Sequence, residues 1–246
     1  MHSTMERWSG RVAVVTGASA GIGAAIAHEL VKKGLKVVGL ARRVEKVEEL
    51  SSSLKSEKGK MYAVKCDVTK ESHVTLAFKW VKENLGGVDI LVNNAGVAID
   101  SSLIDGSTED LKKMLDLNIL ALSVCTKEAL KSMKERGVDD GHIININSVA
   151  GHIPPQDYFC MYAATKHAIT ILTEGLRREL VARDSNIRVT SISPGLVKTD
   201  LPPKVVLQVS PYLNPEDIAG SVVYVLDTPP HVQIHELTIL PVRQRL

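Results

Sequence analysis

The sequence of 246 residues predicts an α/β fold built on a doubly wound parallel sheet. Short runs rich in Val and Ile alternate with longer amphipathic segments from one end of the chain to the other, which indicates repeated strand-helix units. The strands are almost uniformly apolar, so helices must cover both faces of the sheet. A glycine-rich turn joins the first strand to the first helix, where folds of this class bind ligands. We therefore expect one Rossmann-type domain over 1–246, with a seven-stranded parallel sheet.

Each element follows from its own pattern. Seven β-branched runs are expected to be strands, in the order 11–16, 36–40, 61–66, 90–93, 142–147, 188–192 and 236–240. Six segments with apolar residues three or four positions apart are expected to be helices, at 23–33, 44–54, 72–84, 108–135, 159–182 and 215–226. The segment at about 196–214 fits neither period and contains three prolines, so we expect a short loop that covers a binding site.

Charge and cysteine content exclude several classes of protein. Thirty Lys plus Arg against 28 Asp plus Glu, interspersed along the chain, give a net charge of +2, so no nucleic-acid partner is expected. No stretch approaches the ~18 uninterrupted apolar residues of a membrane span, and 1–10 contains no apolar core of signal-peptide length. Cys66, Cys125 and Cys160 are odd in number and lie in apolar contexts. We expect buried thiols in a cytoplasmic protein, with neither disulfides nor a metal site.

The turn after the first strand carries three glycines. Strand 11–16 runs into a helix through Gly17, Gly21 and Gly23 in the order T-G-x-x-x-G-x-G, with Ser19 and Ile22 between them. Glycines at such a turn let backbone amides approach a pyrophosphate at the positive end of the helix. We expect a dinucleotide site here. The alternative is a tight turn that only needs small residues.

The end of the second strand indicates which dinucleotide binds. An acidic residue at this position bonds the ribose 2′-hydroxyl of NAD, whereas Arg accommodates a 2′-phosphate. Arg42 and Arg43 stand here without a carboxylate, so NADP (NADP⁺/NADPH) is favoured over NAD. The alternative is that both arginines are solvated at a helix start. Ala20 stands in the glycine turn where many NADP-preferring proteins carry a second basic residue.

Tyr162 and Lys166 lie four residues apart in a segment with helical periodicity, so they project from the same helix face. A phenol titrates near pH ~10, and a neighbouring ammonium favours the phenolate. Lowering that pKa by ~3 units requires about 4 kcal/mol, so we expect positive charge on an oxidised nicotinamide to assist the lysine. The pair predicts an acid/base catalyst, although this spacing also occurs by chance in many helices.

Two polar residues complete the expected catalytic group. Ser148 follows the fifth strand, at the sheet edge where parallel sheets place ligands, and its hydroxyl can hydrogen-bond a substrate oxygen. Asn118 lies inside the long helical segment 108–135, where Asn is a poor helix former and indicates a bend that holds an ordered water. Caps and polar surface are the ordinary alternatives for both residues.

With N-N-A-G at 93–96 and P-G at 194–195, the chain from about 12 to 240 resembles the short-chain dehydrogenase/reductase family. The resemblance implies hydride transfer between a nicotinamide and an alcohol or carbonyl carbon. It implies that Tyr162 exchanges the proton, Ser148 holds the substrate oxygen, Lys166 binds the nicotinamide ribose, and Asn118 anchors a water. The cofactor contacts that it adds are Asp67, Val68, Asn94, Ala95, Gly96, Pro194, Gly195, Val197 and Thr199. Asp67 could equally cap the helix that follows it.

Further segments resemble the animal dehydrogenase/reductase member-eleven group and the insect farnesol dehydrogenases: M-E-R-W at 5–8, G-L-K-V-V-G at 34–39, S-M-K-E-R at 132–136 and D-D-G-H-I-I-N-I-N-S at 139–148. This resemblance implies an apolar substrate, with a farnesol-like terpenoid alcohol first and 3- or 17-ketosteroids or dicarbonyls as the alternative. The residues expected to line its pocket are Ile153, Phe159, Leu196, Leu201 and Val206. These side chains could instead simply pack a loop onto the core.

Two further expectations concern pocket size and assembly. The lid 196–214 is shorter than in close relatives, which affects the size of the pocket. Pairing through 108–135 and 159–182, as in relatives, implies a homodimer or homotetramer. An NADP(H)-binding sensor or scaffold without catalysis is an alternative of another class, because a fold does not establish its chemistry.

Overall fold

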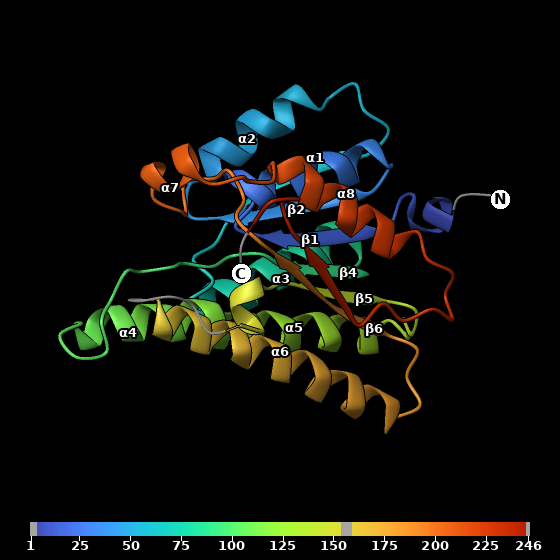
Figure 1. Ribbon diagram of the computed structural model, residues 1–246. Helices are drawn as coiled ribbons and strands as arrows, with labels where there is room; N and C mark the ends of the chain where they lie inside the picture. The colour runs from blue at the N-terminus through green and yellow to red at the C-terminus, as the bar shows by residue number, and fades with distance from the viewer. Residues whose placement is uncertain (1–3, 154–158, 245–246) are drawn as a thin grey trace.

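A computed structural model describes residues 4–153 and 159–244 of the chain (Figure 1). Its seven strands form one parallel sheet in the order β3-β2-β1-β4-β5-β6-β7, which confirms the predicted fold class. The strands are β1 (Val12–Thr16), β2 (Lys36–Ala41), β3 (Lys60–Lys65), β4 (Ile90–Asn93), β5 (His142–Ile146), β6 (Arg188–Pro194) and β7 (Glu236–Ile239). Observed ends lie within two residues of the predicted ones.

The strand order creates a crevice beside β1. Strands β2 and β3 follow one another on one side of β1. The next strand in the chain, β4, lies on the other side of β1. The connections that leave the carboxyl ends of β1 and β4 therefore diverge, and ligands of doubly wound sheets bind in the gap between them.

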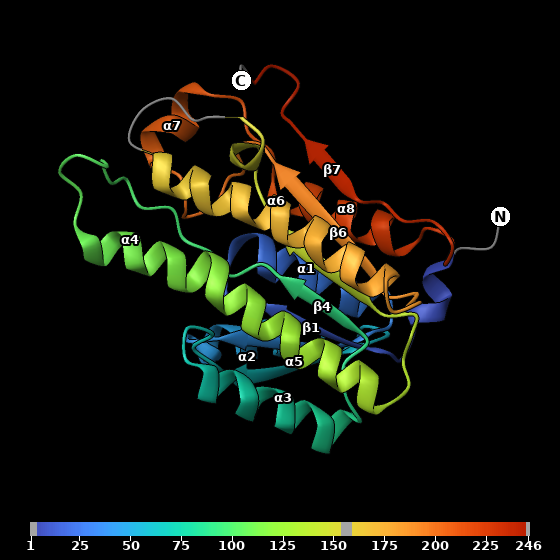
Figure 2. The ribbon, with the colours of Figure 1, turned by 90° about the horizontal axis from the view of Figure 1, so that it is seen from below.

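Two layers of helices sandwich the sheet (Figures 1 and 2). Two separate clusters of buried apolar residues, one on each face of the sheet, show which helices pack on which face. One layer contains α1 (Gly21–Lys32), α2 (Val44–Ser53) and α8 (Pro215–Leu226), and the other contains α3 (Glu71–Leu85), α5 (Leu122–Glu135) and α6 (Cys160–Val181).

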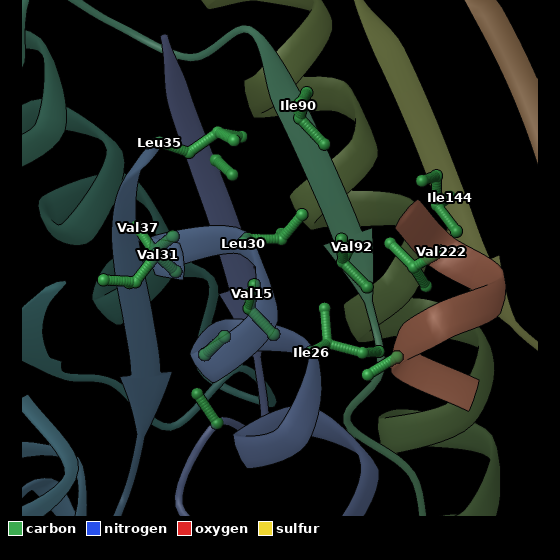
Figure 3. Packing of buried hydrophobic residues seen from close by; sticks show 14 of the residues in the cluster. Val15, Ile26, Leu30, Val31, Leu35, Val37, Ile90, Val92, Ile144 and Val222 are labelled. Carbon is green, nitrogen blue, oxygen red and sulfur yellow. The ribbon is translucent and has the colours of Figure 1, made fainter. Parts of the chain in front are cut away.

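The alternation of side chains along β1 shows why both layers are needed. Ala13 and Val15 belong to the buried cluster under α1 and α8, whereas Val12 and Val14 belong to the cluster under α3 and α5. Figure 3 shows Ile26 and Leu30 of α1 and Val222 of α8 pointing toward the sheet. Burying a side chain of this size contributes about 1.5–3 kcal/mol to the free energy of folding. The many buried side chains on both faces thus stabilise the sheet that carries the glycine turn and the other strand ends.

The segment predicted to be helical at 108–135 is helical over its whole length, but it is not one regular α-helix. The structure has α4 (Thr108–Leu115), a π-helical turn η2 (Asp116–Ala121), and only then α5. The π-helical turn surrounds Asn118, whose side chain bonds both the backbone N–H and the backbone oxygen of Val97. A π-turn adds a residue to the helix and thereby turns a side chain toward an outside partner, which a regular α-helix would not do.

Three short elements were not predicted. They are η1 (Thr4–Trp8), η3 (Val149–Gly151), and α7 (Lys204–Val209), which lies inside the segment expected to be a loop. Helix α7 has six residues, and each of them is at least partly exposed, so the segment is too short for a one-sided apolar stripe to predict it.

The expectation of three buried thiols is also only partly right. Cys66 and Cys125 are buried, but Cys160 is exposed because it begins α6 at the surface. Within the described part of the chain, no helix combines the length and the apolar character needed to cross a membrane.

Candidate active site

A cleft of about 990 Å³ lies at the carboxyl ends of the strands and gathers most of the residues predicted from the sequence. The predicted residues that line it are Gly17, Ser19, Gly21, Ile22, Arg42, Arg43, Asp67, Val68, Asn94, Ala95, Gly96, Ser148, Phe159, Tyr162, Lys166, Pro194, Gly195, Leu196, Val197, Thr199, Leu201 and Val206. One continuous cleft thus contains both the expected cofactor residues and the expected catalytic tyrosine.

The glycine turn leaves the start of α1 open to a ligand. Gly17 and Gly21 have φ values of 67° and 53°, in the left-handed region where glycine is favoured. Helix α1 starts after Ala20, which makes no side-chain capping bond. The first amides of α1 have no partner within the helix, so their partial positive charge fits the pyrophosphate of a dinucleotide.

The glycine turn also packs against Thr199, and Gly23 supports it. A Cβ on Gly21 would lie 3.0 Å from Cγ2 of Thr199, so the segment after β6 packs directly on the glycine turn. Gly23 does not line the cleft. A Cβ there would overlap the backbone oxygen of Gly17, so Gly23 supports the turn from behind.

The end of β2 presents the two arginines at the edge of the cleft. Arg43 donates from Nη2 to Oγ of Ser19 at 3.4 Å, which places its guanidinium beside the glycine turn. Burial would raise the pKa of Asp67, but hydrogen bonds from the Thr69 hydroxyl and amide, together with the charge of Arg42, lower it overall. Asp67 is therefore a carboxylate held by Thr69. It does not cap α3, whose N-cap residue is Lys70.

The N-N-A-G motif ties β4 to β1 across the crevice. The Thr16 hydroxyl accepts hydrogen bonds from the amides of Asn94 and Ala95, at 2.9 and 3.0 Å. The Asn94 side chain donates to the Thr16 backbone oxygen at 2.9 Å. Asn93, in contrast, is buried and bonds Thr126 and Asn145 within the core. The second asparagine thus shapes the cleft, whereas the first joins the strands to the helices.

Tyr162 and Lys166 project from α6 into the inner part of the cleft. Lys166 is 6% exposed, and its Nζ donates to the Ile146 oxygen at 3.0 Å and lies 5.7 Å from the centre of the Tyr162 ring. Burial lowers the pKa of Lys166 to about 8. Burial also raises the pKa of Tyr162, and a hydrogen bond with the Ser148 side chain offsets part of that rise. The phenol is therefore protonated at neutral pH, the form that can donate a proton.

Ser148 is the N-cap residue of η3. Its Oγ accepts the Ala150 amide at 3.1 Å, so the hydroxyl proton remains available for another acceptor. The Ser148 hydroxyl and the Tyr162 phenol can therefore both donate a hydrogen bond to the same oxygen atom of a molecule bound in the cleft.

Asn118 lies behind the cleft wall. Besides its two bonds to Val97, it donates to the Thr165 hydroxyl at 3.0 Å, so its side-chain amide joins the strand end at 96–97 to α6. A Cβ on Gly96 would lie 3.5 Å from Oδ1 of Asn118 and 4.0 Å from Nζ of Lys166. Asn118 thus adjoins α6 without lining the cleft.

One predicted pocket residue is not part of the lining. Ile153 does not line the cleft, and its backbone amide donates to the Val149 oxygen of η3. Several lining residues were not predicted from the sequence, among them Leu40, Ala41, Cys66, Thr69, Ile146, Asn147 and Gln244. Asn147 could have been found because it precedes Ser148 at a strand end, whereas Gln244 has no such signal. Among the described residues, no cluster of three or more His, Cys, Asp or Glu side chains could hold a metal ion.

Comparison with known proteins gives consistent results. The family model for short chain dehydrogenase matches residues 11–209. Farnesol dehydrogenase of Aedes aegypti is 51% identical, with 98% of this chain and 100% of that protein covered. Dehydrogenase/reductase SDR family member 11 of Mus musculus is 49% identical, with 98% and 97% covered. An alcohol dehydrogenase from Thermococcus sibiricus, solved with 5-hydroxy-NADP, superposes with a TM-score of 0.85 at 31% identity and covers 96% of this chain and 98% of that one.

Proposed function

The chain belongs to the short-chain dehydrogenase/reductase family of oxidoreductases, and from that premise we propose that it is an NADP(H)-dependent alcohol dehydrogenase and carbonyl reductase acting on an apolar, farnesol-like alcohol. The observation that carries the proposal is that Ser148, Tyr162 and Lys166 line one cleft together with the uncapped start of α1, with Lys166 Nζ 5.7 Å from the centre of the Tyr162 ring. The farnesol dehydrogenase that is 51% identical supports the substrate class.

The residues present fit a bound nicotinamide dinucleotide. The uncapped start of α1 suits its pyrophosphate, and the cleft continues from there to Tyr162. We assign the rest of the cofactor to residues around Asp67, Asn94 and Val197. The bound nicotinamide supplies or accepts the hydride. In reduction, Tyr162 donates its phenolic proton to the carbonyl oxygen, and the Ser148 hydroxyl hydrogen-bonds the same oxygen.

Lys166 and Asn118 support this step. The Lys166 ammonium has one N–H on the Ile146 oxygen, which leaves two N–H groups for the ribose hydroxyls of the cofactor. Its positive charge favours the phenolate that forms when Tyr162 gives up its proton. We assign Asn118 to holding the Val97 segment and a relay water next to α6.

We propose the segment 196–214 as a lid over an apolar substrate within a single domain of 1–246. Phe159, Leu196, Leu201 and Val206 share the cleft with Tyr162 and give it an apolar lining. An apolar chain bound there would leave water, which favours a long terpenoid alcohol over a short one by ~0.8 kcal/mol per buried methylene.

We also propose that the enzyme is a cytoplasmic homodimer or homotetramer that pairs through α5 and α6. Ile171 and Val181 of α6, together with Leu120 beside α5, are more than half exposed although they are large and apolar. A second copy would bury them. Sedimentation velocity of the purified protein tests this assembly.

The substrate and cofactor are tested together by nicotinamide absorbance with farnesol, a short alcohol and a hydroxysteroid, each with NADP⁺ or NAD⁺. We expect kcat/KM with NADP⁺ to be highest for farnesol, because a long apolar alcohol fills the lined cleft better than a short one, and the relative that is 51% identical is a farnesol dehydrogenase. A preference for the hydroxysteroid would replace the terpenoid substrate by a steroid. No turnover in either direction, with cofactor bound, would support a binding function instead.

The preference for NADP is tested by Arg42→Ala combined with Arg43→Ala. Charge-assisted bonds from Arg to a phosphate contribute about 1.5–3 kcal/mol, so we expect KM for NADPH to rise at least tenfold while KM for NADH changes little. The control is Arg183→Ala, a largely exposed arginine just after α6. An unchanged ratio of the two KM values would mean that both arginines are solvated and that NADP selectivity arises elsewhere.

A further inference from the structure

The C-terminal segment reaches the cleft, which the sequence did not indicate. After β7 the chain turns back, with the Gln244 amide donating to the Pro241 oxygen at 3.0 Å. In Figure 2 the red C-terminal trace ends close to the orange segment that follows β6. Gln244 accepts the Leu196 amide on its Oε1 at 2.9 Å and lines the cleft.

The contact between this segment and Gly195 is close. A Cβ on Gly195 would overlap the carboxamide of Gln244 and would lie 3.0 Å from the Leu240 side chain. Gly195 therefore lets the C-terminal segment pack directly against the backbone after β6. A larger residue at 195 would displace Gln244 and remove the bond to Leu196.

The other bonds that hold the segment 195–198 come from the backbone. Gly195 donates to the Ile239 oxygen, Leu196 accepts from the Leu213 amide, and Lys198 donates to the Leu213 oxygen, each at 2.8 Å. Gln244 supplies the one side-chain bond in this set, and it holds the amide that none of the backbone bonds satisfies. The bond is partly buried, so losing the Gln244 oxygen leaves the Leu196 amide to water at best and loosens this part of the wall.

We propose that Gln244 is a positioning residue whose carboxamide fixes the Leu196 backbone, so that the C-terminal segment sets the cleft wall formed by 194–197. That wall lies next to the position assigned above to the nicotinamide and the substrate, and in this respect the inference rests on the proposed function. Gln244 acts through Leu196, and the adenosine half of the cleft, around Arg42 and Asp67, does not depend on it.

The test uses two variants of the full-length protein and a neighbouring control. Gln244→Leu removes the acceptor for the Leu196 amide, whereas Gln244→Glu keeps an oxygen at the same position. Arg243→Ala changes an exposed residue one position earlier and serves as the control. Three quantities are measured for each protein: hydrogen exchange of the Leu196 amide by NMR, the Kd of NADPH, and the Kd of 2′,5′-ADP, which carries only the adenosine half.

In Gln244→Leu we expect faster exchange at Leu196 and about a fivefold weaker Kd for NADPH, the effect of one lost hydrogen bond, with the Kd of 2′,5′-ADP unchanged. Gln244→Glu is expected to keep Leu196 protected, and Arg243→Ala to match the wild type. Unchanged exchange and unchanged NADPH affinity in Gln244→Leu would overturn the proposal, as would an equal loss of 2′,5′-ADP affinity. If the wild type binds no NADPH, the proposed function fails, while the Leu196 exchange rates still decide whether Gln244 holds the wall.

Discussion

Tyr162→Phe is expected to lower kcat for farnesol oxidation and for carbonyl reduction about 10³-fold, with NADPH affinity nearly unchanged. The variant removes one oxygen, the atom assigned to exchanging the proton with the substrate, and general acid/base groups typically contribute 10²- to 10⁴-fold. Its aromatic ring still fills the same space beside Lys166, so the cleft should keep its shape. Steady-state turnover and a titration of NADPH fluorescence measure the two effects separately.

Tyr224→Phe is the matched control for this variant. Tyr224 lies on α8, is 59% exposed and takes no part in the cleft, so its loss of a hydroxyl should leave kcat unchanged. Full turnover in Tyr162→Phe would show that another group transfers the proton. Unchanged function in cells without turnover in vitro would support a sensor or scaffold.

The parts of the site that follow from local chemistry could be predicted from the sequence. The glycine turn is predictable because positive φ values and an open helix start depend on a few consecutive residues. Tyr162 and Lys166 are predictable because residues four apart on a helix share a face. Ser148 is predictable because parallel sheets place their ligands at the carboxyl ends of the strands.

Long-range pairings were not predictable in this way. Gln244 bonds a backbone amide 48 residues away and belongs to no periodic pattern. The π-helical turn at Asn118 depends on a partner at Val97, which the sequence of 108–135 does not contain. Ile153 is apolar like its neighbours in the predicted pocket, but it does not line the cleft. Apolar composition suggests burial without saying on which side of a turn a residue lies.

Lys166→Met is expected to raise the free energy of unfolding at pH 7 by about 2 kcal/mol. Burial lowers the pKa of Lys166 from 10.5 to about 8, which corresponds to about 3 kcal/mol of cost for the buried charge. The variant loses the bond to the Ile146 oxygen, which offsets about 1 kcal/mol of that gain. Methionine has a similar length and is unbranched, so it fills the same space.

The pH dependence of this gain gives a second check. The unfolded chain holds the Lys166 proton more tightly than the folded protein, so wild-type stability rises with pH between about 8 and 10.5. The advantage of Lys166→Met is therefore largest below pH 8 and shrinks above it. Urea unfolding at pH 7 and pH 9.5 measures the change, with the exposed Lys79→Met as control. A constant difference between the two pH values would mean that the Lys166 charge costs the fold nothing.

The same substitution is expected to reduce kcat/KM for carbonyl reduction about 10²-fold. The ammonium that favours loss of the Tyr162 proton and binds the cofactor ribose is gone, while the phenol remains in place.

In the wild type, the kcat/KM of reduction should fall as pH rises through about 8, because Lys166 then loses its charge. Lys166→Met should lack that fall, since nothing at this position titrates. A pH profile of kcat/KM that keeps the same fall in the variant would assign it to another group. A more stable but nearly inactive variant would show that the buried charge is retained for chemistry at the expense of stability.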